Sequence, residues 1–124
     1  MKSLLLTAFV VATSLHAATE ITWQRQQLHG EFYSEGAGIG DINGDGKPDI
    51  VAGPFWWEGP AFTVKHAYYE PKIFSINGYS DNFFAYVHDF NADQKNDILI
   101  LGFPGKEARL YLNVERTSKF VPSG

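Results

Sequence analysis

Residues 41–49 read Asp41-Ile42-Asn43-Gly44-Asp45-Gly46-Lys47-Pro48-Asp49, and this stretch sets the pattern for the 124-residue chain. A weaker copy, Asp89-Phe90-Asn91-Ala92-Asp93-Gln94-Lys95-Asn96-Asp97, begins 48 residues later. Both copies place oxygen-bearing side chains at positions 1, 3, 5 and 9 of a short loop. Alternate residues of a tight turn can point such oxygens inward, and Ca²⁺ takes roughly six to eight oxygen ligands. The spacing is therefore typical of a cation-binding loop.

Charge crowding favours a bound cation, although a loop without metal is the alternative. Two carboxylates about 5 Å apart repel by about 3 kcal/mol at an effective dielectric constant of about 20, and a divalent ion would remove that cost. Asn and Asp also favour turns without any ion. The second loop is the weaker case, because Gln94 stands where the first loop has Gly46, and a left-handed turn is harder for Gln than for Gly.

The residues after each loop exclude an EF-hand and predict strands. An EF-hand needs a bidentate Glu at loop position 12, but that position is Ala52 in the first copy and Ile100 in the second. The segments Asp49–Gly53 and Asp97–Leu101 are short aliphatic runs close to Gly and Pro, which is typical of β-strands. Position 9 of each loop therefore closes the loop and opens a strand.

At these residues the sequence resembles the FG-GAP or VCBS repeats of calcium-dependent β-propellers, which occur in integrin α-subunit heads and in many secreted bacterial proteins. The first copy carries that family's Asp-x-Asn-x-Asp-Gly-x-x-Asp loop complete, and the second copy lacks the glycine. The segment Trp56–Pro60 is similar to the aromatic, Pro-ended turn that often follows the loop in bacterial members. The resemblance covers about residues 36–114.

The resemblance implies two structural calcium ions, one in each loop. In the first loop we expect side-chain ligation by Asp41, Asn43, Asp45 and Asp49, with Lys47 binding through its backbone carbonyl. The matching set in the second loop is Asp89, Asn91, Asp93, Lys95 and Asp97. Each ion would pin the turn between the first and second strands of a blade, so that binding is coupled to folding.

The chain is predicted to be all-β, a partial β-propeller of about two four-stranded antiparallel blades. Blade one spans about residues 33–70 and blade two about 83–124. The predicted strands cover 37–41, 49–53, 55–58 and 62–69 in the first blade, and 84–89, 97–103, 109–114 and 119–121 in the second. Residues 19–32 form either an outer strand or an entry segment. The glycines of 36–40 suit an innermost strand, where backbones crowd.

Closed propellers have roughly four to eight blades, so two blades are too few to form a closed propeller. We expect a fragment of a larger propeller or a truncated gene product, with the remaining blades supplied in cis or by oligomerisation.

Residues 1–18 are predicted to be a secretory signal peptide, with Lys2 before the apolar run Leu4–Ala12 and small residues near the cleavage position. A buried N-terminal helix is the alternative. The apolar run is well short of the roughly twenty residues that cross a bilayer, so no membrane span is predicted. The mature chain, residues 19–124, is expected to be secreted, either extracellular or periplasmic. Calcium is abundant outside the cell, where weak sites fill.

Composition narrows the classes of function. The chain has no cysteine, which excludes a disulfide scaffold, and a formal net charge of -4 with scattered basic residues, which argues against nucleic acid. The four histidines are not spaced as a zinc trio, and none belongs to a recognisable nucleophile motif. No catalytic residue is therefore assigned, and an enzymatic function is not favoured.

The function that the resemblance implies is a secreted calcium-binding module whose propeller face recognises extracellular protein or polysaccharide, as in cell adhesion. The alternative is the N-terminal part of a propeller enzyme that acts on sugars, of the lyase, dehydratase or hydrolase type. The aromatic cluster Phe55–Trp57 either stacks on sugar rings or fills the wedge between blades.

Overall fold

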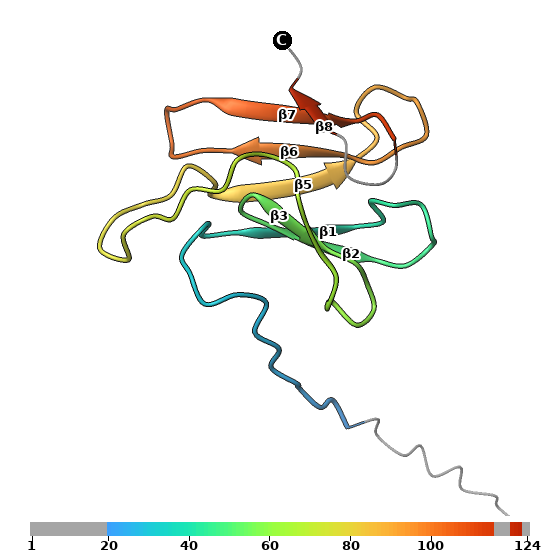
Figure 1. The fold of residues 1–124 in the computed structure, drawn as a ribbon, viewed down its shortest axis with the longest axis horizontal. Helices are drawn as coiled ribbons and strands as arrows, with labels where there is room; N and C mark the ends of the chain where they lie inside the picture. Colours follow the sequence, from blue (N-terminus) through green and yellow to red (C-terminus); the bar gives the residue numbers. More distant parts are fainter. Residues whose placement is uncertain (1–19, 116–119, 123–124) are drawn as a thin grey trace, which may run out of the picture.

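The structure, a computed structural model, describes residues 20–115 and 120–122, and within them the chain is all-β with no helix. Eight strands form two four-stranded antiparallel sheets, each with its strands in chain order. The sheets lie against each other (Figure 1) and do not close into a ring within the described residues. The predicted signal peptide, residues 1–18, lies outside the described residues.

The predicted division into two four-stranded sheets is confirmed. The first sheet contains β1 (Ala37–Gly40), β2 (Asp49–Ala52), β3 (Phe55–Trp57) and β4 (Lys65–Ala67). The second sheet contains β5 (Phe84–His88), β6 (Asp97–Leu101), β7 (Ala108–Asn113) and β8 (Phe120–Pro122). Each candidate loop connects the first and second strands of its sheet, as predicted.

The strand predicted over 62–69 is shorter in the structure, because a wide turn precedes it. Phe62 has a φ of 54° and donates its N–H to the Glu58 carbonyl at 2.9 Å. Glu58 in turn donates its N–H to the Val64 carbonyl at 3.0 Å. The pairing of β3 with β4 therefore starts only where Trp57 faces Lys65.

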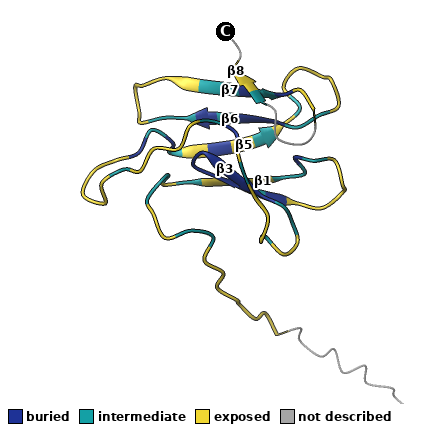
Figure 2. Ribbon diagram, in the orientation of Figure 1, coloured by how far each residue is buried: buried dark blue, intermediate teal, exposed yellow. Residues whose placement is uncertain are grey.

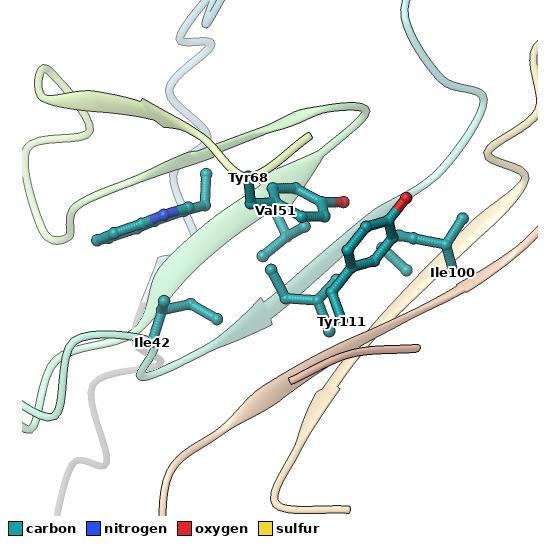
Figure 3. Packing of buried hydrophobic residues seen from close by; sticks show 8 residues of the cluster. Ile42, Val51, Tyr68, Ile100 and Tyr111 are labelled. Atoms are coloured by element: carbon teal, nitrogen blue, oxygen red, sulfur yellow. The ribbon is translucent and has the colours of Figure 1, made fainter. Parts of the chain in front are cut away.

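The main core lies between the two sheets (Figure 3). It forms because alternate residues of a strand point to the same face. Val51 and Trp56 of the first sheet pack on Ile98, Ile100 and Tyr111 of the second. The complete buried cluster is Ile42, Val51, Trp56, Tyr68, Ala85, Ile98, Ile100 and Tyr111. Each fully buried aliphatic or aromatic side chain contributes about 1.5–3 kcal/mol, so this interface accounts for much of the stability.

Glycines on β1 let the first strands of the two sheets approach closely. A Cβ atom on Gly38 would lie 2.6 Å from the Ala85 carbonyl oxygen, and one on Gly40 would lie 2.5 Å from Val87 Cγ1. Both distances are too short for real contacts. The small residues of this segment therefore serve close backbone approach, in agreement with the sequence-based expectation.

The other face of the first sheet has its own cluster, covered by the chain segment that leads into the fold. Phe55 and Trp57 are buried there, and Leu28 and Tyr33 pack on them. Trp56 points the opposite way, into the main core. Of the two interpretations of the aromatic cluster, filling the space between the sheets therefore holds for Trp56 alone, while Phe55 and Trp57 are buried on the opposite face of the first sheet. Residues 20–32 hold no strand, so they are an entry segment rather than an outer strand.

The outer face of the second sheet is partly open (Figure 2). Ile98 and Ile100 are fully buried on the inner face of β6, whereas Leu99 and Leu101 on the outer face are half-buried. A strand that is apolar throughout, as β6 is in the sequence, is expected to be covered on both sides, and this expectation is wrong for its outer face. Tyr86 of the neighbouring strand is exposed on that face as well.

Three tyrosines meet at one edge of the main core. Tyr68 lies edge-on to Tyr111, with ring centroids 5.2 Å apart, and Tyr69 stacks on Tyr111 at 5.3 Å. Burial raises the pKa of Tyr68 and Tyr111 above the ordinary value and raises the pKa of Tyr69 to about 12. The folded state therefore favours the neutral phenols.

We expect the protein to lose stability in alkaline solution. A phenol whose pKa is raised on folding stabilises the protein fully below the ordinary pKa of 10.0, and this contribution is lost as the pH rises toward about 12. Thermal melts should show a Tm that falls above about pH 10. Tyr69→Phe removes one ionisable hydroxyl and should make the fall shallower. An equally steep fall in both proteins would contradict this origin.

Candidate metal loops

The side chains of the first loop turn inward onto its own backbone, as the spacing predicts. Asp45 donates its N–H to Asp41 Oδ1 at 3.1 Å and to Asn43 Oδ1 at 3.0 Å. Gly46 donates its N–H to Asp41 Oδ2 at 2.9 Å. Lys47 donates its N–H to Asp45 Oδ1 at 2.9 Å. The side chains of positions 1, 3 and 5 therefore accept hydrogen bonds from the backbone of their own loop.

The second loop repeats these four hydrogen bonds. Asp93 donates its N–H to Asp89 Oδ1 at 3.0 Å and to Asn91 Oδ1 at 3.1 Å. Gln94 donates its N–H to Asp89 Oδ2 at 2.8 Å, and Lys95 donates its N–H to Asp93 Oδ1 at 2.9 Å. The two predicted sites therefore share one local geometry.

The backbone is left-handed at positions 4 and 6 of both loops. Gly44 and Gly46 have φ values of 77° and 82°, and their counterparts Ala92 and Gln94 have 62° and 67°. A left-handed conformation costs a residue other than glycine about 1–2 kcal/mol. The second loop keeps the geometry at this cost, so its hydrogen bonds and its surroundings outweigh the local preference.

Position 9 of the first loop is a buried carboxylate that joins two turns. Asp49 is fully buried, its Oδ2 accepts the N–H of Ile42 at 2.7 Å, and its Oδ1 accepts the N–H of Gly59 at 2.8 Å. The loop and the β3–β4 turn are thereby held by a single side chain. Hydrogen bonds to a charged group contribute about 1.5–3 kcal/mol each, so Asp49 stabilises the fold whether or not an ion is present.

Position 9 of the second loop has the same role with different partners. Asp97 is also fully buried, its Oδ2 accepts the N–H of Phe90 at 3.0 Å, and its Oδ1 accepts the N–H of Asn113 at 2.9 Å. The partner on the neighbouring segment is at the end of β7 instead of in a turn. The pair Asp49 and Asp97 will be called the clamp carboxylates.

Two asparagines connect the loops to each other, and sequence reasoning did not assign them a role. Asn113 donates its side-chain N–H₂ to the carbonyls of Ile42 at 2.8 Å and Asn96 at 3.1 Å. Asn96 donates its own to the carbonyl of Asp41 at 2.7 Å. The first loop has Pro48 where the second has Asn96, so this bridge has no counterpart in the repeat. A polar hollow of about 120 Å³ lies between the two loops.

A lysine lies beside the carboxylate at position 5 in each loop. Lys47 Nζ is 3.5 Å from Asp45 Oδ2, and Lys95 Nζ is 2.6 Å from Asp93 Oδ2. The hydrogen bond from Lys95 holds the pKa of Asp93 below its ordinary value. The ammonium groups offset part of the negative charge, and Lys95 would compete with a cation for Asp93.

The side-chain oxygens of the two loops are of the donor type that hard cations such as calcium prefer, but the structure does not bring them together as a metal-binding set. Within residues 20–115 and 120–122, no group of three or more His, Cys, Asp or Glu side chains is gathered as a metal-binding set. A carboxylate offers about four lone-pair sites. Both sites of Asp41 Oδ1 are taken by the N–H groups of Gly44 and Asp45, whereas Asp41 Oδ2 accepts one N–H group and keeps capacity for an ion. An all-oxygen set suits calcium or magnesium rather than zinc. The clamp carboxylates are the least accessible members because they are buried.

A second feature was not anticipated from the sequence. A hollow of about 530 Å³ lies between the connection into β5 and the β6–β7 turn, next to the exposed ring of Tyr79. In Figure 1 these two segments lie at the end of the sheets opposite to the candidate metal loops. From the sequence alone, an aromatic residue in a connecting loop is expected to anchor that loop to the core. The sequence therefore held no signal for this hollow.

The chain matches none of the protein-family models, curated proteins or solved structures with which it was compared. In the described part of the chain, no helix is long and apolar enough to cross a membrane.

Exchanging the residues at loop position 6 should move stability in opposite directions. Gln94→Gly relieves a left-handed glutamine and is expected to stabilise the protein by about 0.5–1 kcal/mol. Gly46→Gln imposes the same strain on the first loop and should destabilise by about 1–2 kcal/mol. A Cβ atom at Gly46 meets nothing within 4 Å, so the effect comes from the backbone. Urea denaturation measures both changes, and changes of the same sign would contradict the shared geometry.

Proposed function

We propose that this chain is a secreted calcium-binding repeat module of the FG-GAP or VCBS type, in which each loop holds one structural Ca²⁺. The observation that carries the proposal is the repetition of one oxygen-gathering loop geometry, with matching hydrogen bonds and left-handed positions, in both sheets. The second loop keeps it even with Ala92 and Gln94 at left-handed positions. Backbone strain that persists at a specific site supports a functional constraint there.

The packing of the sheets supports their assignment as neighbouring propeller blades. Each sheet runs in chain order from an inner strand outward, and β1 packs against β5 through Gly38 and Gly40. Blades of a propeller are four-stranded sheets arranged around a central channel. The partly open outer face of the second sheet offers a place for a further blade, supplied in cis or by another copy of the chain.

Calcium would act on the position of side chains rather than on a reaction. When bound, the ion supplies a fixed double positive charge that neutralises the loop carboxylates. The chain itself provides Asp41, Asn43 and Asp45 on the exposed side of the first loop, while Asp49 anchors the loop to the sheet. Asp89, Asn91, Asp93 and Asp97 are the corresponding residues of the second loop. An ion that binds only the folded chain stabilises it by mass action.

The proposed setting is extracellular or periplasmic, in keeping with the signal peptide predicted for residues 1–18. Extracellular calcium modules bind with dissociation constants of about 10⁻⁴–10⁻³ M. Such weak sites are filled outside the cell, where the calcium concentration is high. The role that follows is recognition of an extracellular ligand by a surface that the two loops keep rigid.

Calcium should raise the stability of the mature chain, residues 19–124, in a saturable manner. At about 100 times the dissociation constant, one site contributes about 2.7 kcal/mol. Calorimetric titration should find two sites, and thermal melts in calcium and in chelator should differ. Asp45→Ala and Asp93→Ala should each remove one site.

The matched control is Glu31→Ala, which removes an exposed carboxylate outside both loops. It should leave both sites and the calcium-dependent rise in Tm unchanged. A folded chain that binds no calcium, and whose Tm is the same in calcium and in chelator, would exclude the proposed function.

A further inference from the structure

The hollow of about 530 Å³ has the dimensions of a small-molecule site, because such pockets enclose about 300–1,000 Å³. Its walls come from two segments at one end of the second sheet, the connection that precedes β5 and the β6–β7 turn (Figure 1). The side chains that line it include Tyr79, Ser80, Asp81, Phe103, Lys106 and Glu107.

Two aromatic rings, Tyr79 and Phe103, line one wall, and Phe83 contacts both of them from outside the lining. The ring centroids of Tyr79 and Phe103 are 5.1 Å apart, and Phe83 lies 5.7 Å from the first and 5.3 Å from the second. Tyr79 is 68% exposed and Phe103 is 38% exposed. Two large rings exposed side by side at a hollow form a joined apolar surface, and such surfaces can mark ligand-binding grooves.

The rest of the lining is charged and balanced. Asp81 and Glu107 contribute two carboxylates, and Lys106 contributes an ammonium group. Arg109 lies behind them, with Nη2 3.1 Å from Asp81 Oδ2 and Nε 3.8 Å from Glu107 Oε1. Two negative and two positive groups leave no net charge to attract an ion. The rim instead offers both acceptors and donors of hydrogen bonds.

Both walls are held in place by their own hydrogen bonds. Ser80 donates its N–H to Glu35 Oε1 at 2.9 Å, and its hydroxyl contacts the other carboxylate oxygen of Glu35. In the β6–β7 turn, Lys106 donates its N–H to the Phe103 carbonyl at 2.8 Å, and Gly105 has a φ of 81°. Such a turn is fixed by its own backbone. The site is therefore formed before a ligand arrives, which lowers the cost of binding.

From this geometry we propose that the hollow binds a neutral saccharide. The C–H face of a pyranose ring stacks on Tyr79, as apolar surface packs on an aromatic face, and an edge of the sugar contacts Phe103, whose ring is tilted by 54° from that of Tyr79. Its hydroxyl groups donate to the carboxylates of Asp81 and Glu107 and accept from Lys106. The inference deepens the recognition role proposed above, while the site itself uses no residue of the candidate metal loops.

Binding is tested on residues 19–124 in calcium-containing buffer by titration with cellotriose, maltotriose and mannotriose. Calorimetry and two-dimensional NMR monitor each titration. At least one trisaccharide should bind saturably. Tyr79→Ala and Phe103→Ala should each weaken binding about tenfold or more, because a buried stacking contact is lost. Glu107→Gln should also weaken binding, without a change in Tm.

The matched control is Trp23→Ala, which removes an aromatic ring that is 92% exposed and lies outside the hollow. It should leave binding unchanged, whereas an equal loss would indicate unspecific stacking and overturn the proposal. Absence of binding by all three trisaccharides to the folded protein would also overturn it. Repeating the melts in calcium and in chelator separates the two proposals. Saccharide binding without a calcium effect supports this site alone, and a calcium effect without saccharide binding supports the metal loops alone.

Discussion

A buried carboxylate must find partners for both oxygens, and the clamp carboxylates meet this demand with backbone amides. Asp49 binds the N–H groups of Ile42 and Gly59, and Asp97 binds those of Phe90 and Asn113. Each clamp joins the start of its loop to the next hairpin of the same sheet. The loop can then enter β2 or β6 in only one register, which decides the side chains that face the core.

The candidate metal loops and the core between the sheets are parts of one arrangement. Asn113 is a hydrogen-bond donor at both ends of the network, because its backbone N–H donates to Asp97 Oδ1 and its side-chain N–H₂ donates to the carbonyl of Ile42, a residue of the main core. Asn96 extends the network to the carbonyl of Asp41. The second loop is therefore docked on the first, and an ion in either loop would order the same interface.

The local sequence pattern predicted the strands and the two repeated loops well. It predicted the contacts between distant segments and the course of the other turns poorly. The strand after each loop and the glycines of β1 followed from residue type and spacing, because these features depend on close neighbours. The shortened β4 depends on a left-handed Phe62, which residue preference does not indicate. The bridge made by Asn96 and Asn113 was not foreseen, since its partners lie 55 and 71 residues away in the chain. The hollow beside Tyr79 likewise depends on two connecting segments that only the fold brings together.

Hydrogen exchange of single backbone amides, measured by NMR in calcium and in chelator, tests the account most directly. The amides of Ile42 and Phe90, bound to the clamp carboxylates, should exchange as slowly as core strand amides in both solutions. The amides of Gly46 and Gln94, bound to exposed loop carboxylates, should become slow only in calcium. Fast exchange at the clamp amides, or loop amides that do not respond to calcium, would contradict the account.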